Sequence, residues 1–232
     1  MRRLIAAAVV VSGAVPALSS AADFASVQRG YAVYAQVCSA CHSLKQVTYA
    51  DLGDLGLTSA QLKALATGAT VTDGTDANGQ PIHRAGRPDD HLPSPFPNEA
   101  AARVANNGAL PPDMSRLALT LDGHQRYIER LLTSYQKAPA GFEVPPGSYY
   151  NTAAPGRLIA MPPPLHDGQV AFTDNTRPNT GQMAHDVAAF LGWVAHPHLE
   201  QRRRVGVSVV LYVALLTLLL FFLKRRIWTH VD

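Results

Sequence analysis

The chain contains only two cysteines, Cys38 and Cys41, among its 232 residues. Both lie in one short motif, so no cysteine is left for a disulfide elsewhere. A strand-rich segment with alternating apolar residues is also lacking around them. This absence argues against a thioredoxin-like dithiol, which lies beside a βαβ pattern. Because the chain also lacks internal repeats and low-complexity tracts, we expect one domain between its two ends.

Positive charge is scarce in the central part of the chain. The whole chain is formally +3, but residues 23–200 carry 16 Asp and Glu against 12 Lys and Arg, a net charge of −4. Such an acidic region argues against nucleic-acid binding and is compatible with docking of a cationic protein. A few surplus carboxylates are equally compatible with ordinary solubility charge.

The segment Cys38-Ser39-Ala40-Cys41-His42 has the spacing of c-type haem attachment. The two thiols add to the two vinyl groups of one porphyrin, and a two-residue gap in a helix-like turn lets both reach the same ring edge. His42 then lies beneath the iron and supplies a strong axial ligand. The motif therefore predicts one covalently attached haem c, with Cys38 and Cys41 as thioether sites and His42 as proximal ligand.

The N-terminus has the features of a secretory signal peptide over residues 1–22. Arg2 and Arg3 precede an apolar run that is too short to span a bilayer, and small residues follow up to Ala22. We therefore expect a bacterial protein exported to the periplasm. An uncleaved N-terminal anchor is the alternative interpretation.

The C-terminal region contains a long uncharged stretch, residues 205–223. A helix of this length, at about 1.5 Å per residue, just spans a hydrocarbon core of about 30 Å. Basic residues flank the stretch on both sides, so the signal peptide rather than the positive-inside rule determines its orientation. We expect a periplasmic haem c domain over residues 23–200, a stop-transfer transmembrane anchor over 201–226 and a cytoplasmic tail over 227–232. A buried helix of a soluble protein is the alternative.

The domain between these ends is predicted to be all-α, a c-type cytochrome fold of several helices and long loops wrapped around one haem. Apolar stripes and capping signals predict helices over residues 25–37, 58–68, 98–107, 122–138 and 180–195. Residues 68–97 and 138–179 are rich in Pro, Gly and Asp and are expected to be loops. Loops of this length are unusual in a compact domain, but a large apolar cofactor acts as a core around which they wrap.

The sixth iron position is usually filled by a Met or a His from elsewhere in the chain. Met161 precedes Pro162-Pro163-Pro164, and a following proline biases a residue toward an extended conformation. The proline triplet stiffens the segment, so it can hold a weak thioether ligand at a fixed distance. We therefore expect Met161 to be the distal ligand. Met183 falls on the apolar stripe of the last helix, and Met114 is equally compatible with hydrophobic packing. His196-Pro197-His198 has a spacing that a metal can use, but it follows the last helix, where positive charge near the membrane is the favoured interpretation.

The order of motifs along the chain closely resembles the cytochrome c1 family. A signal peptide precedes Gly30-Tyr31-Ala32-Val33-Tyr34 and the haem motif, and an anchor follows at the C-terminus. The other shared segments are Arg-Pro-Asp-Asp at 87–90, Ala-Asn-Asn-Gly-Ala-Leu-Pro-Pro-Asp at 105–113, Ile-Ala-Met-Pro-Pro at 159–163 and Asp-Val-Ala-Ala-Phe-Leu at 186–191. The resemblance covers essentially the whole mature chain, and its most specific segment is 106–113.

This resemblance implies the cytochrome c1 subunit of ubiquinol–cytochrome c reductase in the bacterial inner membrane, a redox subunit of a respiratory electron-transport complex and not an enzyme on its own. It implies three partners: cytochrome b, the Rieske iron–sulfur protein as electron donor and a soluble cytochrome c as acceptor. It also implies that His42 and Met161 are the two iron ligands. The residues implied to line the haem pocket are Asn106, Pro111 and Tyr127.

The sequence departs from this family at two points. The family often has Arg-x-Arg after the Pro-Pro-Asp segment, and the second arginine serves a haem propionate. Here residues 119–121 are Leu-Thr-Leu, which leaves Arg116 and Arg126 as candidate substitutes. Some bacterial relatives also join the Met-bearing loop with a disulfide, for which this chain has no cysteine.

Two other functions are compatible with a haem c motif and an anchor. A membrane-tethered carrier that feeds an oxidase would have a smaller head and a flexible linker, whereas the connection over residues 197–204 is short. A haem peroxidase or gas sensor would need an open or displaceable sixth position, which the stiff segment at Met161 disfavours.

Overall fold

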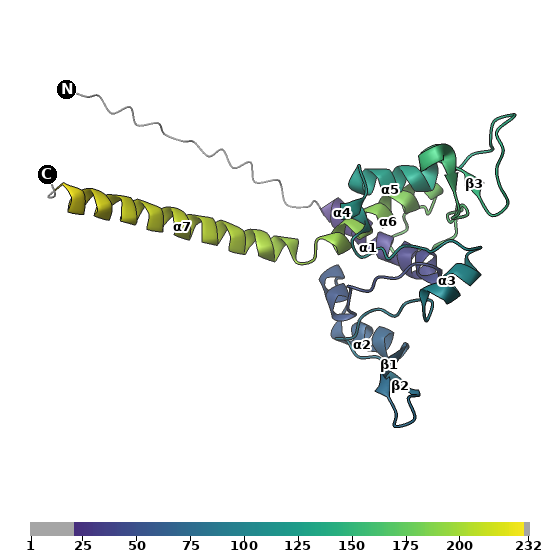
Figure 1. Ribbon diagram of the computed structural model, residues 1–232, viewed down its shortest axis with the longest axis horizontal. Coiled ribbons are helices and arrows are strands. Elements are labelled where there is room, and N and C mark those ends of the chain that lie inside the picture. The colour runs from purple at the N-terminus through teal and green to yellow at the C-terminus, as the bar shows by residue number, and fades with distance from the viewer. Residues whose placement is uncertain (1–20, 230–232) are drawn as a thin grey trace.

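The computed structural model describes residues 21–229. Most of the predicted signal peptide and residues 230–232 of the predicted tail therefore lie outside the described part. A helical domain is followed by one long helix that extends away from it (Figure 1). The α-helices are α1 (Ala21–Gln36), α2 (Ser59–Thr67), α3 (Glu99–Ala105), α4 (Leu117–Thr120), α5 (His124–Thr133), α6 (Thr180–Ala195) and α7 (Leu199–Trp228). The 3₁₀ helices and strands are η1 (Cys38–Ala40), η2 (Ala50–Leu55), η3 (Pro155–Arg157), β1 (Thr70–Thr75), β2 (Pro81–Ala85), β3 (Tyr149–Tyr150) and β4 (Leu158–Ile159).

The core of the domain is built on the contact between α1 and α6, with α4 and α5 packed on α6. Phe190 of α6 is fully buried, and its ring lies 5.7 Å and 5.8 Å, centroid to centroid, from Tyr31 and Tyr34 of α1. Gly30 makes this close approach possible, because a Cβ at this position would overlap the carbonyl oxygen of Asp186. The apolar stripes predicted for the first and last helices thus face each other, and the all-α class is confirmed.

A buried ion pair also joins α1 to α6. The guanidinium of Arg29 donates from Nε to Oδ2 of Asp186 at 2.7 Å and from Nη2 to Oδ1 at 3.1 Å. Asp186 is fully buried, and its Oδ1 also accepts from Gln182 at 3.0 Å. Arg29 reaches Asp174 as well, at 2.7 Å from Nη1. Since an unpaired buried charge is costly, this bidentate pair holds the two helices in one register.

Side-chain caps set the starts of three helices. Thr58 and Gln61 form a reciprocal capping box at the start of α2. Asn98 and Asn179 accept hydrogen bonds from the first turns of α3 and α6. After α3, the first left-handed residue is Asn107 (φ +52°), one position before the glycine expected there. Gly108 follows with φ +88°, and its N–H donates to the carbonyl of Arg103 at 2.7 Å.

Three predicted segments differ in the structure. The predicted loop over 138–179 contains a short antiparallel pair of strands, β3 and β4. Helix α5 ends at Thr133 instead of continuing toward Pro139, because Asn151 Nδ2 donates to the carbonyl of Leu131 at 2.8 Å and Tyr135 pairs with Asn151 in an isolated β-bridge. The predicted loop over 68–97 contains an antiparallel hairpin of β1 and β2. A turn at Asp76 closes this hairpin, since its carboxylate accepts from the backbone N–H groups of residues 78 and 80.

Helix α7 begins four residues after the end of α6 and leaves the domain on one side (Figure 1). Its 28 residues from Gln201 to Trp228 are long and apolar enough to cross a membrane. At about 1.5 Å per residue they extend roughly 42 Å, more than the hydrocarbon thickness of about 30 Å. The apolar side chains of this segment are exposed along its length, as expected for a helix whose packing partner is lipid or another membrane helix.

Candidate haem site

The cysteine-histidine motif forms a tight turn directly after α1. The backbone N–H groups of Cys41 and His42 both donate to the carbonyl of Cys38, at 3.1 Å and 2.9 Å. Both cysteines are free thiols; Cys38 is half-buried and Cys41 is exposed. Burial, reinforced by the nearby Cys41, raises the pKa of Cys38 to about 12. The predicted helix-like turn is present, and its two thiols remain available for thioether bonds.

The imidazole of His42 is held in one tautomer by a backbone carbonyl. Its Nδ1 lies 2.8 Å from the oxygen of Pro112. A carbonyl oxygen only accepts, so Nδ1 carries the proton and the lone pair of the neutral ring lies on Nε2. Burial lowers the pKa of His42, outweighing the raising effects of the Pro112 carbonyl and of the nearby Asp113. A neutral imidazole with a free Nε2 is the donor that haem iron requires, so the residues present fit the group.

A cavity of about 330 Å³ adjoins the motif. Cys41 and Pro111 both line it, so the structure brings together a predicted thioether site and a predicted pocket residue. The remaining walls come from the turn after the motif, from the segment that precedes α3, from α3 itself and from the residue before Pro111, with lining residues Ser43, Lys45, Ser94, Pro95, Phe96, Pro97, Asn98, Glu99, Ala102 and Leu110.

The other predicted site residues make their contacts with other parts of the domain. Asn106 ends α3, and its Nδ2 donates to the carbonyl of Ala102 at 2.7 Å. Tyr127 is half-buried on α5, with the Arg130 guanidinium carbon 5.5 Å from its ring centroid. Among residues 21–229, no hydrogen bond, ion pair or ring contact joins these two residues, or the side chain of Met161, to the cysteine-histidine motif. Their roles toward a haem therefore stay predictions.

Met161 is half-buried and is held through its backbone. The hydroxyl of Tyr135 donates to the carbonyl of Met161 at 3.0 Å, while the Tyr135 backbone bridges to Asn151. Tyr135 falls within the helix predicted over 122–138, and sequence reasoning missed this contact. The nearest signal was the tyrosine hydroxyl itself, which needs a partner when it is buried. Met183 lies in the hydrophobic core, as its sequence context predicts, and Met114, whose role the sequence leaves open, lies there too.

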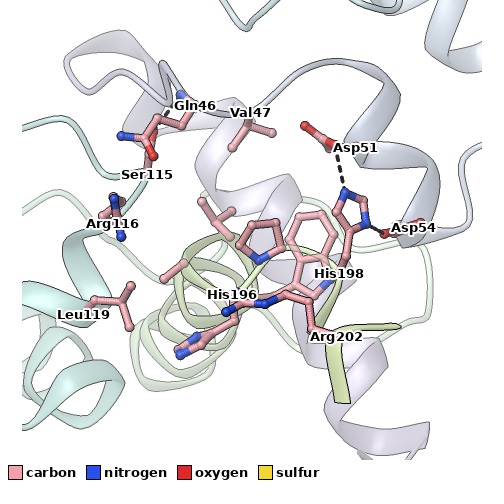
Figure 2. Close-up of a pocket in the computed structure, with 14 residues that line it drawn as sticks. Gln46, Val47, Asp51, Asp54, Ser115, Arg116, Leu119, His196, His198 and Arg202 are labelled. Atoms are coloured by element: carbon pink, nitrogen blue, oxygen red, sulfur yellow. Dashed lines mark hydrogen bonds and ion pairs between the residues drawn. The ribbon is translucent and has the colours of Figure 1, made fainter. Parts of the chain in front are cut away.

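A larger cavity, about 510 Å³, lies at the junction of the domain and α7. Figure 2 shows His198 between Asp51 and Asp54, at 3.8 Å from Nε2 to Oδ1 of Asp51 and 3.3 Å from Nδ1 to Oδ2 of Asp54. His198 thus connects the start of α7 to η2. Arg116, one candidate for the propionate arginine, lines this cavity, whereas the other, Arg126, is exposed on α5.

Comparison with known proteins gives the same family as the order of motifs along the chain. The model of the Cytochrome C1 family matches residues 16–231. A cytochrome c1 of Rhodospirillum rubrum is 40% identical over 226 residues, which cover 90% of this chain and 83% of the relative. The mitochondrial cytochrome c1 haem protein of Schizosaccharomyces pombe is 43% identical over 210 residues, 90% of this chain and 68% of the relative. A Bradyrhizobium diazoefficiens protein named cytochrome b/c1 is 39% identical over 228 residues, 89% of this chain and 33% of the relative.

Proposed function

The chain belongs to the cytochrome c1 family, and we propose on this basis that it is a mono-haem c-type electron carrier of a quinol–cytochrome c oxidoreductase. The observation that carries the proposal is the hydrogen bond from His42 Nδ1 to the carbonyl of Pro112, which leaves the Nε2 lone pair for a metal, in a motif whose two thiols are free. When bound, the haem would supply a one-electron couple of its iron between the ferrous and ferric states.

The residues of the chain hold and tune this group. Cys38 and Cys41 would attach it covalently, and His42 would hold the iron from one side. Met161, in its proline-stiffened segment, would hold it from the other side and favour the ferrous state, since a thioether is a soft ligand. Asn106, Pro111 and Tyr127 would line the pocket. The chain is a redox subunit in this account, and the complex performs the reaction.

The partners follow from the family and from the anchor. A relative named cytochrome b/c1 supports association with cytochrome b. We place the Rieske iron–sulfur protein before this chain in the electron path and a soluble cytochrome c after it. The net charge of −4 over residues 23–200 favours a basic acceptor through long-range attraction.

The proposed topology has one membrane crossing. Residues 1–22 would direct export, residues 23–200 would form the periplasmic haem domain, 201–226 would cross the bacterial inner membrane and 227–232 would lie in the cytoplasm. Support comes from α7, which is long and apolar enough to span a bilayer, and from the short connection between α6 and α7. This connection keeps the haem domain close to the membrane, as a subunit of a membrane complex requires.

The proposal is tested by purifying the membrane protein through a C-terminal affinity tag in mild detergent. We expect one covalent haem c per chain, together with b-type haem and the electron paramagnetic resonance signal of an iron–sulfur cluster. Recovery of the haem protein alone would favour a tethered carrier. Tight binding of carbon monoxide by the reduced protein would favour a peroxidase or sensor.

The distal ligand is tested in the same preparation with two methionine variants. Met161→Leu keeps the side-chain volume nearly constant and should abolish the weak iron–sulfur charge-transfer band of the ferric protein. Met114→Leu is the matched control, because Met114 is a core residue that is 5% exposed, and it should keep the band. The reverse result would assign the ligand to Met114.

A further inference from the structure

Asp113 ends the Pro-Pro-Asp segment, residues 111–113. Its side chain binds the residues that directly follow the cysteine-histidine motif. Its Oδ2 accepts from the Ser43 hydroxyl at 2.7 Å and from the Lys45 backbone N–H at 2.9 Å. Its Oδ1 accepts from the Ser115 backbone N–H at 3.0 Å. Both carboxylate oxygens are therefore engaged, and one of them ties together residues about 70 positions apart in the chain.

Two further hydrogen bonds surround this carboxylate. The N–H of Met114 donates to the carbonyl of Ser43 at 2.9 Å, and the N–H of Gln46 donates to the Ser115 hydroxyl at 3.1 Å. Ser43, Met114 and Ser115 are all buried, with exposures of 8%, 5% and 2%. Water therefore does not readily replace a lost partner, and the two segments move together.

The position of the His42 partner depends on this connection. The carbonyl that accepts from His42 belongs to Pro112, and its peptide plane is shared with the backbone nitrogen of Asp113. The proline ring has no N–H with which to anchor its own residue. The nearest side chain that anchors this carbonyl is thus that of Asp113, the residue after Pro112. Ser43, which donates a hydrogen bond to Asp113, is the residue after His42.

The carboxylate acts here as an acceptor only. Burial by itself would raise the pKa of Asp113, but the hydrogen bonds from Lys45, Ser115 and Ser43 outweigh burial and lower it. The ionised group offers lone pairs to all three donors. An amide of the same shape has one acceptor oxygen and one NH₂ group, so in either orientation its NH₂ would face a donor.

We propose that Asp113 is a positioning residue for the proximal ligand, acting through Ser43 and Pro112 to fix the rotation of the His42 imidazole and the strength of its Nδ1 hydrogen bond. This inference rests on the proposed function, in which His42 binds haem iron. A strong bond from Nδ1 to a carbonyl makes the imidazole a better electron donor and favours ferric iron. Loosening this connection should therefore favour the ferrous state.

The test compares Asp113→Asn, Ser43→Ala and Asp89→Asn with the wild-type holoprotein. Ser43→Ala removes one donor without changing the charge, and Asp89→Asn removes one negative charge at an exposed position. For Asp113→Asn, the ratio of reduced to oxidised haem at a fixed ambient potential should rise roughly three- to fivefold, the factor that one net hydrogen bond contributes to an equilibrium. Ser43→Ala should shift it in the same direction by less, and Asp89→Asn should leave it unchanged.

The ferric electron paramagnetic resonance spectrum distinguishes orientation from charge, because its g values depend on the plane of the axial imidazole. They should change in Asp113→Asn and Ser43→Ala and remain those of the wild type in Asp89→Asn. Unchanged g values and redox ratio in the first two variants would overturn the inference. If Asp113→Asn fails to retain haem, Ser43→Ala decides the question. A wild-type spectrum without histidine ligation would refute the proposed function instead.

Discussion

Replacing Gly30 by alanine should push α1 away from α6. The added Cβ would overlap the carbonyl oxygen of Asp186 and lie 2.6 Å from both the Asp186 carbonyl carbon and Phe190 Cβ. Backbone atoms cannot rotate out of the way, so the helices must separate. Overpacking of this kind costs about 1–3 kcal/mol, and the gain of about 0.5–1 kcal/mol from replacing glycine within a helix offsets only part of it.

The net destabilisation should therefore be about 1 kcal/mol. For a protein of this size, that lowers Tm by roughly 2–4 °C, which thermal unfolding followed by circular dichroism measures. Two alanine variants of α6 serve as controls. A Cβ at Gly181 would make only an ordinary contact, 3.4 Å from Asn179 Oδ1. A Cβ at Gly192 would overlap the Gln125 side chain from Cγ to Nε2, but this side chain is flexible and can turn away. Both should change Tm less. An unchanged Tm for Gly30→Ala would refute this helix packing.

Three further results are expected. Tyr135→Phe removes the 3.0 Å hydrogen bond to the Met161 carbonyl, so the ferrous holoprotein should bind carbon monoxide about fivefold more tightly, the factor for one net hydrogen bond. An unchanged affinity for carbon monoxide would show that this bond does not restrain Met161. Asp186→Ala leaves Arg29 without its buried partner and should cost about 3 kcal/mol in chemical denaturation; a loss below about 1 kcal/mol would contradict a structural role. In haem-free protein at pH 8, Cys38 should be alkylated roughly 10³-fold more slowly than an ordinary thiol of pKa about 8.5, because its pKa of about 12 leaves little thiolate. The alkylation rate should rise with pH up to about 12, and a rate equal to that of a model thiol would contradict the burial of Cys38.

Local signals in the sequence predict much of the helical framework. The apolar stripes of α1 and α6 face each other at Phe190. The ends of α2, α3 and α6 are set by side chains next to them in sequence, such as Asn98 and Asn179. Such information is contained in a few consecutive residues, so it can be read without the tertiary structure.

Long-range partners explain the predictions that differ. Helix α5 is shorter than its apolar stripe because Asn151, about 20 residues later, binds the carbonyl of Leu131. The hydrogen bond between Tyr135 and Met161 likewise joins distant segments. The His42 ring is bound by a backbone oxygen, that of Pro112. Every residue has such an oxygen, so nothing in the sequence except the Pro-Pro-Asp segment itself points to this hydrogen bond.

The most direct test of the proposed function is a stopped-flow experiment on the complex purified through this chain. Quinol is mixed with the oxidised complex and soluble cytochrome c, and absorbance of the covalent haem is followed through the first turnovers. Electrons should enter this haem and leave it to cytochrome c at least as fast as steady-state turnover. If turnover continues while this haem stays in one redox state, the haem does not lie on the electron path and the proposed function is wrong.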